Sequence, residues 1–194
     1  MTAILPKYAP TRVCRGDTVL TFISGGCKNG KSWYAQRLAK AAGEPLYYVA
    51  TMISTGAEDD ARIARHIRDR DGWGFETLEC GRNITECLNR ADAKGSFLLD
   101  SVTALLANEM FVPNGFDADA PEHVAAQLEA FAERVGNAVF VSDYIYGDAA
   151  IYDEWTENYR RGLALEDRRL ASVCDNVLEV SAGRVICHKG VKLL

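Results

Sequence analysis

The chain has 194 residues, of which 48% are hydrophobic, and this length predicts one α/β domain with a continuous core. Its 22 basic and 27 acidic residues give a formal net charge of −5 without a basic run, so we expect neither nucleic acid nor an anionic membrane as a main partner. The six cysteines form no C-x-x-C pair and no apolar run reaches the length of a membrane span, which predicts reduced thiols and a cytoplasmic protein.

Residues 1–17 precede the first predicted element and are interpreted as an N-terminal extension. They contain Lys7, Arg12 and Arg15 but lack the apolar region of a signal peptide. Residues 18–194 are predicted to form a single nucleotide-binding catalytic domain.

A phosphate-binding loop follows the first apolar run. Residues 18–24 are predicted to form a buried strand, and the next eight residues fit the pattern G-x-x-x-x-G-K-[ST]. These residues are Gly25, Gly26, Cys27, Lys28, Asn29, Gly30, Lys31 and Ser32. The glycines let successive backbone N–H groups turn toward a phosphate, Lys31 can reach the β- and γ-phosphates, and the Ser32 hydroxyl suits Mg²⁺. The loop predicts nucleotide binding, whereas a plain glycine-rich turn before a helix is the weaker alternative.

Strands and helices alternate after this loop. Residues 33–42 indicate a helix that Gly43 closes, and residues 46–50 indicate a buried strand. Thr55 and Glu58 have the spacing of a capping box, which predicts a polar, Arg-rich helix over residues 59–70. The next predicted elements are a strand over 75–78, a helix over 83–93, a strand over 95–100 and a helix over 102–111.

The second half continues the alternation. We expect a loop over 112–120, a helix with Pro121 in its first turn, a strand over 138–142, a helix over 154–174, and a hairpin of strands 176–181 and 185–188. Apolar strands separated by helices favour an α/β fold with a mostly parallel sheet that helices cover on both faces. We therefore predict a P-loop NTPase-like (RecA-like) domain with an antiparallel C-terminal edge hairpin.

Asp100 closes the apolar run of residues 97–99. It should emerge at the same sheet edge as the phosphate loop, where ligands bind in such sheets, and could hold Mg²⁺ together with Ser32. The alternative is that Asp100 only caps the helix that follows Ser101.

Residues 46–79 carry further signatures. They are Tyr48-Val-Ala-Thr-Met52, Asp60-Ala-Arg-Ile63, His66, Arg70, Trp73 and Thr77-Leu-Glu79. Together with the phosphate loop, these residues make the chain resemble the bifunctional adenosylcobinamide kinase / adenosylcobinamide-phosphate guanylyltransferase family of cobalamin biosynthesis. The resemblance covers residues 19–189 and is closest in the first hundred residues.

The resemblance implies a set of site residues and partners. His66 corresponds to the histidine that becomes guanylylated in this family. The second catalytic residue is Lys31 of the phosphate loop. The nucleotide contacts implied outside that loop are Ala50, Thr51, Met52, Ile67, Arg68, Asp69, Arg70, Glu79 and Asp100. It also implies a corrinoid substrate of the adenosylcobinamide type, GTP or ATP as co-substrate, and a homotrimer.

The chemistry of the side chain supports His66 independently. A histidine on a polar helix is more often a surface residue, yet imidazole is the side chain that offers an uncharged nucleophile near pH 7. Neighbouring arginines such as Arg62 and Arg65 can balance the charge of a bound phosphate. We expect His123 and His188 to be structural.

The second half departs from the family pattern. Where the family has an Asn-Glu pair after the strand over 138–142, this chain has Asp143 and Tyr144, and Asp167 replaces a family Asn. We expect this region to shape the corrinoid side of the site and the subunit contacts.

The expected function is a pair of reactions. The γ-phosphate of GTP or ATP passes to adenosylcobinamide, and GMP then passes from GTP through His66 to the new phosphate, giving adenosylcobinamide-GDP and pyrophosphate. One alternative is a corrinoid kinase without the guanylyl step. Another is a non-catalytic GTP-binding switch, against which the lack of an Asn-Lys-x-Asp motif argues.

Overall fold

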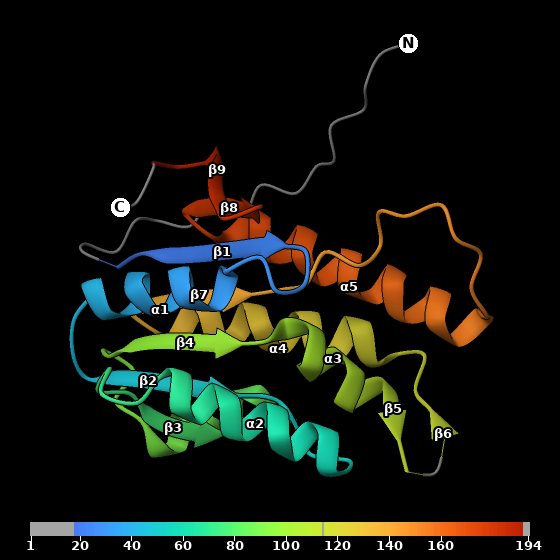
Figure 1. Ribbon diagram of the computed structural model, residues 1–194, viewed down its shortest axis with the longest axis horizontal. Helices are drawn as coiled ribbons and strands as arrows, with labels where there is room; N and C mark the ends of the chain where they lie inside the picture. The colour runs from blue at the N-terminus through green and yellow to red at the C-terminus, as the bar shows by residue number, and fades with distance from the viewer. Residues whose placement is uncertain (1–17, 114, 192–194) are drawn as a thin grey trace.

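The computed structural model describes residues 18–113 and 115–191 (Figure 1), so the expected extension over residues 1–17 lies outside the described residues. Its main strands are β1 (Leu20–Gly25), β2 (Leu46–Ala50), β3 (Glu76–Glu79), β4 (Ser96–Asp100), β7 (Asn137–Val141), β8 (Asn176–Ser181) and β9 (Arg184–Lys189). They form one seven-stranded sheet in the order β3-β2-β4-β7-β1-β8-β9. Neighbouring strands are parallel except β8 and β9, which pair antiparallel at the edge. The predicted fold class is confirmed.

Helices cover both faces of the sheet. They are α1 (Lys31–Ala41), α2 (Ala57–Asp69), α3 (Val102–Met110), α4 (Ala120–Arg134), α5 (Glu154–Val173) and the 3₁₀ helix η1 (Ile84–Arg90). Figure 1 shows α1 and α2 in front of the sheet, whereas α4 lies behind it. Alternate residues of the strands face the two layers, so Ile23 and Leu98 pack with the α1 side and Phe22 and Leu99 with the opposite side.

The centre of the opposite layer is aromatic. The ring of Phe131 lies edge-on to Phe97 at 5.5 Å and to Phe140 at 6.0 Å between ring centroids. All three side chains are fully buried. This contact fixes α4 against β4 and β7, and β7 lies directly beside the phosphate-loop strand β1.

Three local predictions were wrong. The segment predicted as a helix over 83–93 is the shorter 3₁₀ helix η1, in which Ile84 and Cys87 are buried at the three-residue spacing that such a helix favours. The predicted loop over 112–120 begins inside a hairpin of β5 (Phe111–Val112) and β6 (Gly115–Phe116), which an aromatic pair across the strands stabilises.

The third concerns the start of α2. Gly56 occupies the N-cap position without a side-chain cap, and Thr55 pairs with Asp59 rather than with Glu58. The Thr55 hydroxyl and N–H donate to Asp59 Oδ2 at 2.6 and 2.9 Å. The capping box is therefore absent, and α2 begins two residues earlier than predicted.

The parallel register brings three strand ends to one edge of the sheet. Ala50 of β2 lies level with Asp100 of β4, and Asp100 lies level with Val141 of β7. Ile23, two residues before the phosphate loop, is also level with Val141. Among the described helices, none has the length and apolar character needed to cross a membrane.

Candidate active site

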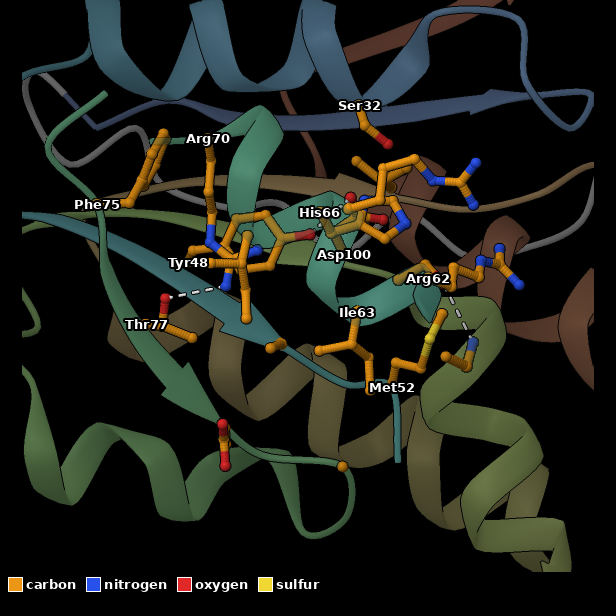
Figure 2. A pocket seen from close by; sticks show the side chains of 18 of the residues that line it. Ser32, Tyr48, Met52, Arg62, Ile63, His66, Arg70, Phe75, Thr77 and Asp100 are labelled. Carbon is orange, nitrogen blue, oxygen red and sulfur yellow. Dashed lines mark hydrogen bonds between the residues drawn. The ribbon is translucent and has the colours of Figure 1, made fainter. Parts of the chain in front are cut away.

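A large cavity opens at this edge of the sheet. Its volume is about 1370 Å³, and it is lined by the phosphate loop, the ends of β2, β3, β4 and β7, and one side of α2 (Figure 2). This exceeds the volume of typical cavities for drug-sized ligands, so a nucleoside triphosphate and part of a second substrate can be accommodated together.

The phosphate loop is held in shape by glycine and by Asn29. Gly30 has a φ of +97°, which favours glycine, and a Cβ at Gly25 would overlap the carbonyl of Val180 in β8. The Asn29 amide donates to that same carbonyl, and its oxygen accepts the Lys31 N–H at 3.2 Å. Asn29 therefore fastens the loop to β8 instead of pointing into the cavity.

Lys31 and Ser32 stand at the start of α1. The Lys31 ammonium donates to the Gly26 carbonyl at 2.7 Å and to Asp143 Oδ1 at 2.8 Å, with only 6% of its side chain exposed. Both Lys31 and Ser32 line the cavity. The lysine charge therefore lies at the wall where the pattern of the loop places phosphates.

Asp100 ends β4 and lines the same cavity. Its Oδ2 accepts a hydrogen bond from the Tyr48 hydroxyl at 3.0 Å. Burial, together with the adjacent Asp100 carboxylate, raises the pKa of Tyr48 well above its usual value, so this hydroxyl remains a donor. The cap of α3 is Ser101, whose hydroxyl accepts from the Ala104 N–H at 3.1 Å. The alternative interpretation of Asp100 as a mere helix cap is therefore wrong.

The helix α2 lies over the cavity and presents one side to it. No residue of α2 is buried, and Arg62, Ile63, His66 and Ile67 follow the spacing of one helical face along the cavity. Arg70 directly follows α2 and, unlike the residues of the helix, is buried, with 8% of its surface exposed.

Arg70 anchors the end of α2 to the sheet. Its guanidinium carbon lies 4.1 Å from the centre of the Tyr48 ring, and Nη2 donates to Thr77 Oγ1 at 3.1 Å (Figure 2). A cation over an aromatic face in a desolvated setting is attracted by up to about 2 kcal/mol. This contact links the His66 helix to the Tyr48 side chain that also touches Asp100.

The cavity brings together most of the residues predicted for the site. Those in its lining are Cys27, Lys28, Lys31, Ser32, Ala50, Met52, His66, Ile67, Arg70, Glu79 and Asp100. Its lining does not include Gly25, Gly26, Asn29, Gly30, Thr51, Arg68 or Asp69.

Thr51 is not part of the described cavity lining. Its side chain is fully buried, donates to the Ser101 carbonyl and accepts from the Ser101 N–H, both at 2.7 Å. It thus supports the backbone beside Asp100. Arg68 and Asp69 are exposed near the end of α2.

The cavity lining also contains residues that were not predicted as site residues, among them Asp143 and Tyr48. Asp143 was treated only as a departure from the family pattern, and Tyr48 only as part of a signature, yet both line the cavity. The signal for Asp143 was present, because it follows a buried strand as Asp100 does, and strand ends are where ligands bind in parallel sheets.

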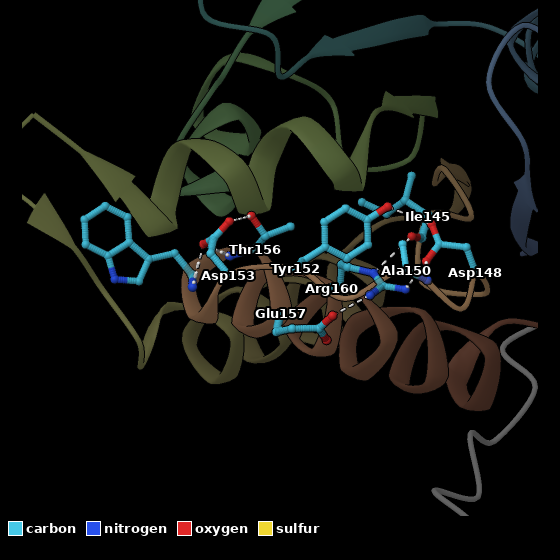
Figure 3. Close-up of polar contacts among 9 residues, drawn as sticks. Ile145, Asp148, Ala150, Tyr152, Asp153, Thr156, Glu157 and Arg160 are labelled. Atoms are coloured by element: carbon cyan, nitrogen blue, oxygen red, sulfur yellow. Dashed lines mark hydrogen bonds and ion pairs between the residues drawn. The ribbon is translucent and has the colours of Figure 1, made fainter.

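One arginine organises the segment after β7. Arg160 of α5 donates to Asp148 at 2.9 Å, to Glu157 at 2.5 Å and to the Ile145 carbonyl at 3.3 Å (Figure 3). Its guanidinium also lies 4.6 Å from the centre of the Tyr152 ring. The segment that leads away from Asp143 is therefore folded against α5.

Comparisons with known proteins identify a matching family. A family described as cobinamide kinase / cobinamide phosphate guanyltransferase matches residues 21–187. One relative is the bifunctional adenosylcobalamin biosynthesis protein CobP of Pseudomonas aeruginosa, which is 29% identical over 88% of this chain and 98% of its own length. Another is the bifunctional adenosylcobalamin biosynthesis protein CobU of Salmonella typhimurium, which is 25% identical over 85% of this chain and 97% of its own length.

Solved structures support the fold alone. One solved ATPase domain gives a TM-score of 0.50 at 11% identity, covering 90% of this chain and 78% of that chain. A KaiC-like protein of Pyrococcus horikoshii OT3 also gives 0.50, at 12% identity, covering 90% of this chain and 80% of that chain.

Proposed function

Since the chain belongs to the cobinamide kinase / cobinamide phosphate guanyltransferase family, we propose that its two reactions share the cavity described above and that His66 carries the GMP group between substrates. The protein is a bifunctional enzyme of cobalamin biosynthesis. It phosphorylates adenosylcobinamide with GTP or ATP and transfers GMP from GTP to adenosylcobinamide phosphate. The observation that carries the proposal is that Lys31 and His66 line one cavity.

In the kinase reaction, the phosphate loop holds the triphosphate. Its backbone N–H groups and Lys31 bind the β- and γ-phosphates, and the cavity-lining parts of β2, β3 and α2 hold the rest of the nucleotide. The Ser32 hydroxyl and the Asp100 carboxylate are oxygen donors on the same cavity, which is the donor type that Mg²⁺ takes. Bound there, Mg²⁺ would supply neutralisation of the charge that develops on the phosphates.

In the guanylyl reaction, His66 is the nucleophile. An imidazole nitrogen attacks the α-phosphorus of GTP, and the bond to the bridging oxygen breaks so that pyrophosphate leaves. The corrinoid phosphate then attacks the same phosphorus and the bond to His66 breaks, which restores the histidine. Arg62 and Arg65 line the cavity beside His66 and can hold the leaving pyrophosphate through charge-assisted hydrogen bonds.

Labelling with GTP radioactive at the α-phosphate tests the role of His66. The wild-type protein should retain an acid-labile, base-stable label, and His66→Ala should fall below about 1% of that label because no other side chain replaces the nucleophile. His123→Ala, which changes an exposed histidine of α4, is the matched control and should label normally.

Measuring the kinase and the guanylyltransferase activity separately distinguishes the possible outcomes. His66→Ala should still phosphorylate adenosylcobinamide, because the phosphate loop is intact. A His66→Ala protein that labels like wild type would overturn the assignment. Phosphorylation by the wild type without GMP transfer would identify a corrinoid kinase that lacks the second step.

The proposal extends to organisation. We place residues 18–194 in one catalytic domain, which assembles as a homotrimer as the family resemblance implies. A cytoplasmic location is part of the proposal, because both reactions consume nucleoside triphosphates.

A further inference from the structure

Asp143 occupies a central position at the edge of the sheet. It lies two residues beyond β7, and β7 lies between the phosphate-loop strand β1 and the Asp100 strand β4. Its backbone N–H donates to Thr103 Oγ1 of α3 at 2.8 Å, which fixes this point of the chain. Its side chain is 23% exposed and lines the cavity.

Lys31 neutralises Asp143 in the structure. The two groups are 2.8 Å apart, and the lysine is almost fully buried. A triphosphate carries more negative charge than one carboxylate, so its arrival draws the flexible ammonium toward the β- and γ-phosphates. Asp143, which lines the same cavity, then loses its counter-ion.

We propose that Asp143 is the catalytic base of the kinase reaction, an inference that rests on the proposed function. As the corrinoid hydroxyl approaches, its O–H bond breaks and the proton passes to a carboxylate oxygen of Asp143. The electron pair of the hydroxyl oxygen forms the new bond to the γ-phosphorus. The bond from that phosphorus to the β–γ bridging oxygen breaks, and the nucleoside diphosphate leaves with the electron pair.

Other carboxylates are placed less well for this role. Asp100 already accepts the Tyr48 hydroxyl and is the proposed partner of Ser32 for Mg²⁺. Glu79 ends β3, which is the far edge strand of the sheet from β1. Among the acidic residues of the described cavity lining, Asp143 is the one paired with Lys31.

An aspartate at position 143 also distinguishes this chain from the pattern of the family. That pattern has Asn-Glu where this chain has Asp143 and Tyr144. Tyr144 is 53% exposed, and its ring packs against Tyr146 at 4.7 Å, away from any contact with Lys31. In this chain the carboxylate therefore stands at the position whose side chain contacts Lys31.

Asp143→Asn tests the proposal in the full-length protein. It keeps the shape of the side chain but cannot accept the proton, so kcat for phosphorylation of adenosylcobinamide should fall about 10²- to 10⁴-fold. GTP should bind as tightly or a few-fold more tightly, because the competitor for Lys31 is weakened. Labelling of His66 by GTP should stay within about 3-fold of wild type. Glu133→Gln, which changes an exposed acid of α4 outside the described cavity lining, is the control that should change neither activity.

The split between nucleotide binding and turnover supplies a second readout. In Asp143→Asn the kinase kcat should fall while the Kd for GTP stays at or below its wild-type value, and in Glu133→Gln both quantities should keep their wild-type values. A kinase kcat within about 3-fold of wild type in Asp143→Asn would overturn the inference. Loss of GTP binding along with both activities would also overturn it, because Asp143 would then serve the shape of the loop. If the wild type itself forms no phosphorylated corrinoid, the proposed function fails instead.

Discussion

At the scale of single residues, two neighbouring carboxyl groups of α5 are buried. Glu166 is fully buried, and neither of its carboxylate oxygens has a hydrogen-bond partner among the described residues. Asp167 accepts the Tyr146 hydroxyl at 2.8 Å. Burial raises the pKa of Asp167 to about 6 and raises the pKa of Glu166 well above its usual value.

Asp167 should therefore make folding depend on pH. Because its folded pKa lies above the unfolded value of about 4, the folded state keeps a proton that the unfolded state releases between about pH 4 and 6. The contribution of Asp167 to the free energy of unfolding is thus full below this range and is lost as the pH rises through about 6. Asp167→Asn, which restores the family amide, should raise the free energy of unfolding at pH 8 by about 1–3 kcal/mol.

Urea unfolding of both proteins at pH 5 and pH 8 measures this difference. The gap between them should narrow at pH 5, where Asp167 is largely protonated. Glu133→Gln, a change of an exposed acid in α4, should leave the pH dependence unaltered. An Asp167→Asn protein that is less stable than wild type at pH 8 would show that the ionised carboxylate is the better partner of Tyr146.

At the scale of elements, α2 is held chiefly through its end. Its residues are not buried, so Arg70 supplies the described anchor to Tyr48 and Thr77. Arg70→Ala should slow His66 labelling at saturating GTP by roughly 10- to 100-fold, given about 1–3 kcal/mol for the lost cation–π contact and hydrogen bond. It should also speed proteolysis within residues 57–69 while leaving the thermal unfolding of the core nearly unchanged.

Tyr48→Phe is the matched variant for this anchor. It keeps the ring under Arg70 and removes only the hydroxyl that donates to Asp100. We expect it to keep wild-type proteolysis of α2. Equal proteolysis of α2 in Arg70→Ala and wild type would contradict the anchoring role.

The first and last residues of most helices and strands could be predicted where the hydrophobic pattern of the sequence was long. The strand predicted over 46–50 is β2, and the helix predicted over 154–174 is α5 to within one residue. The β5–β6 hairpin could not be predicted, because two-residue strands have no periodicity and depend on the contact of Phe111 with Phe116. The start of α2 was mispredicted because Asp59, and not Glu58, reaches back to Thr55.

At the scale of the whole molecule, the order of the strands in the sheet decides which site residues can be predicted from the sequence. Residues in local motifs can be predicted, whereas contacts between neighbouring strands cannot. The phosphate loop, Asp100 and His66 have local signatures, and the structure brings them to one cavity. The contact of Lys31 with Asp143 joins residues 112 positions apart, and it follows from β7 lying beside β1. Sequence patterns predicted both strands but not that they are neighbours.

The proposed homotrimer can be tested by measuring the mass of the wild type and of a variant in one exposed residue. Large exposed apolar side chains lie on β5, in the segment between β7 and α5, and at the start of α5; they are Phe111, Tyr144, Ile151, Tyr152 and Trp155. We expect some of them to belong to the subunit contact, because exposed apolar surface is buried at interfaces. Three subunits of 21.3 kDa give about 64 kDa, and sedimentation should find this mass for the wild type.

Ile151→Asp should shift that mass toward 21.3 kDa at micromolar concentration. Ile151 is 98% exposed, so the change costs the single subunit little. Ile186→Asp, on β9, is the control and should keep the wild-type mass. A wild type that sediments at 21.3 kDa would refute the trimer, whereas a trimer unaffected by Ile151→Asp would place the contact elsewhere.

The hydrogen bond from Asn29 to Val180 has a consequence for when the phosphate loop can reach its final structure during protein synthesis. The phosphate loop belongs to the first strand and helix, but it is fastened to a strand that lies 151 residues later in the chain. During synthesis, β8 leaves the ribosome about 150 residues after the phosphate loop, and domains complete their folding as units. A nascent chain therefore carries a phosphate loop that is not yet fixed to β8 until that strand has been made, so its capacity to bind nucleotide develops only after β8 has joined the sheet.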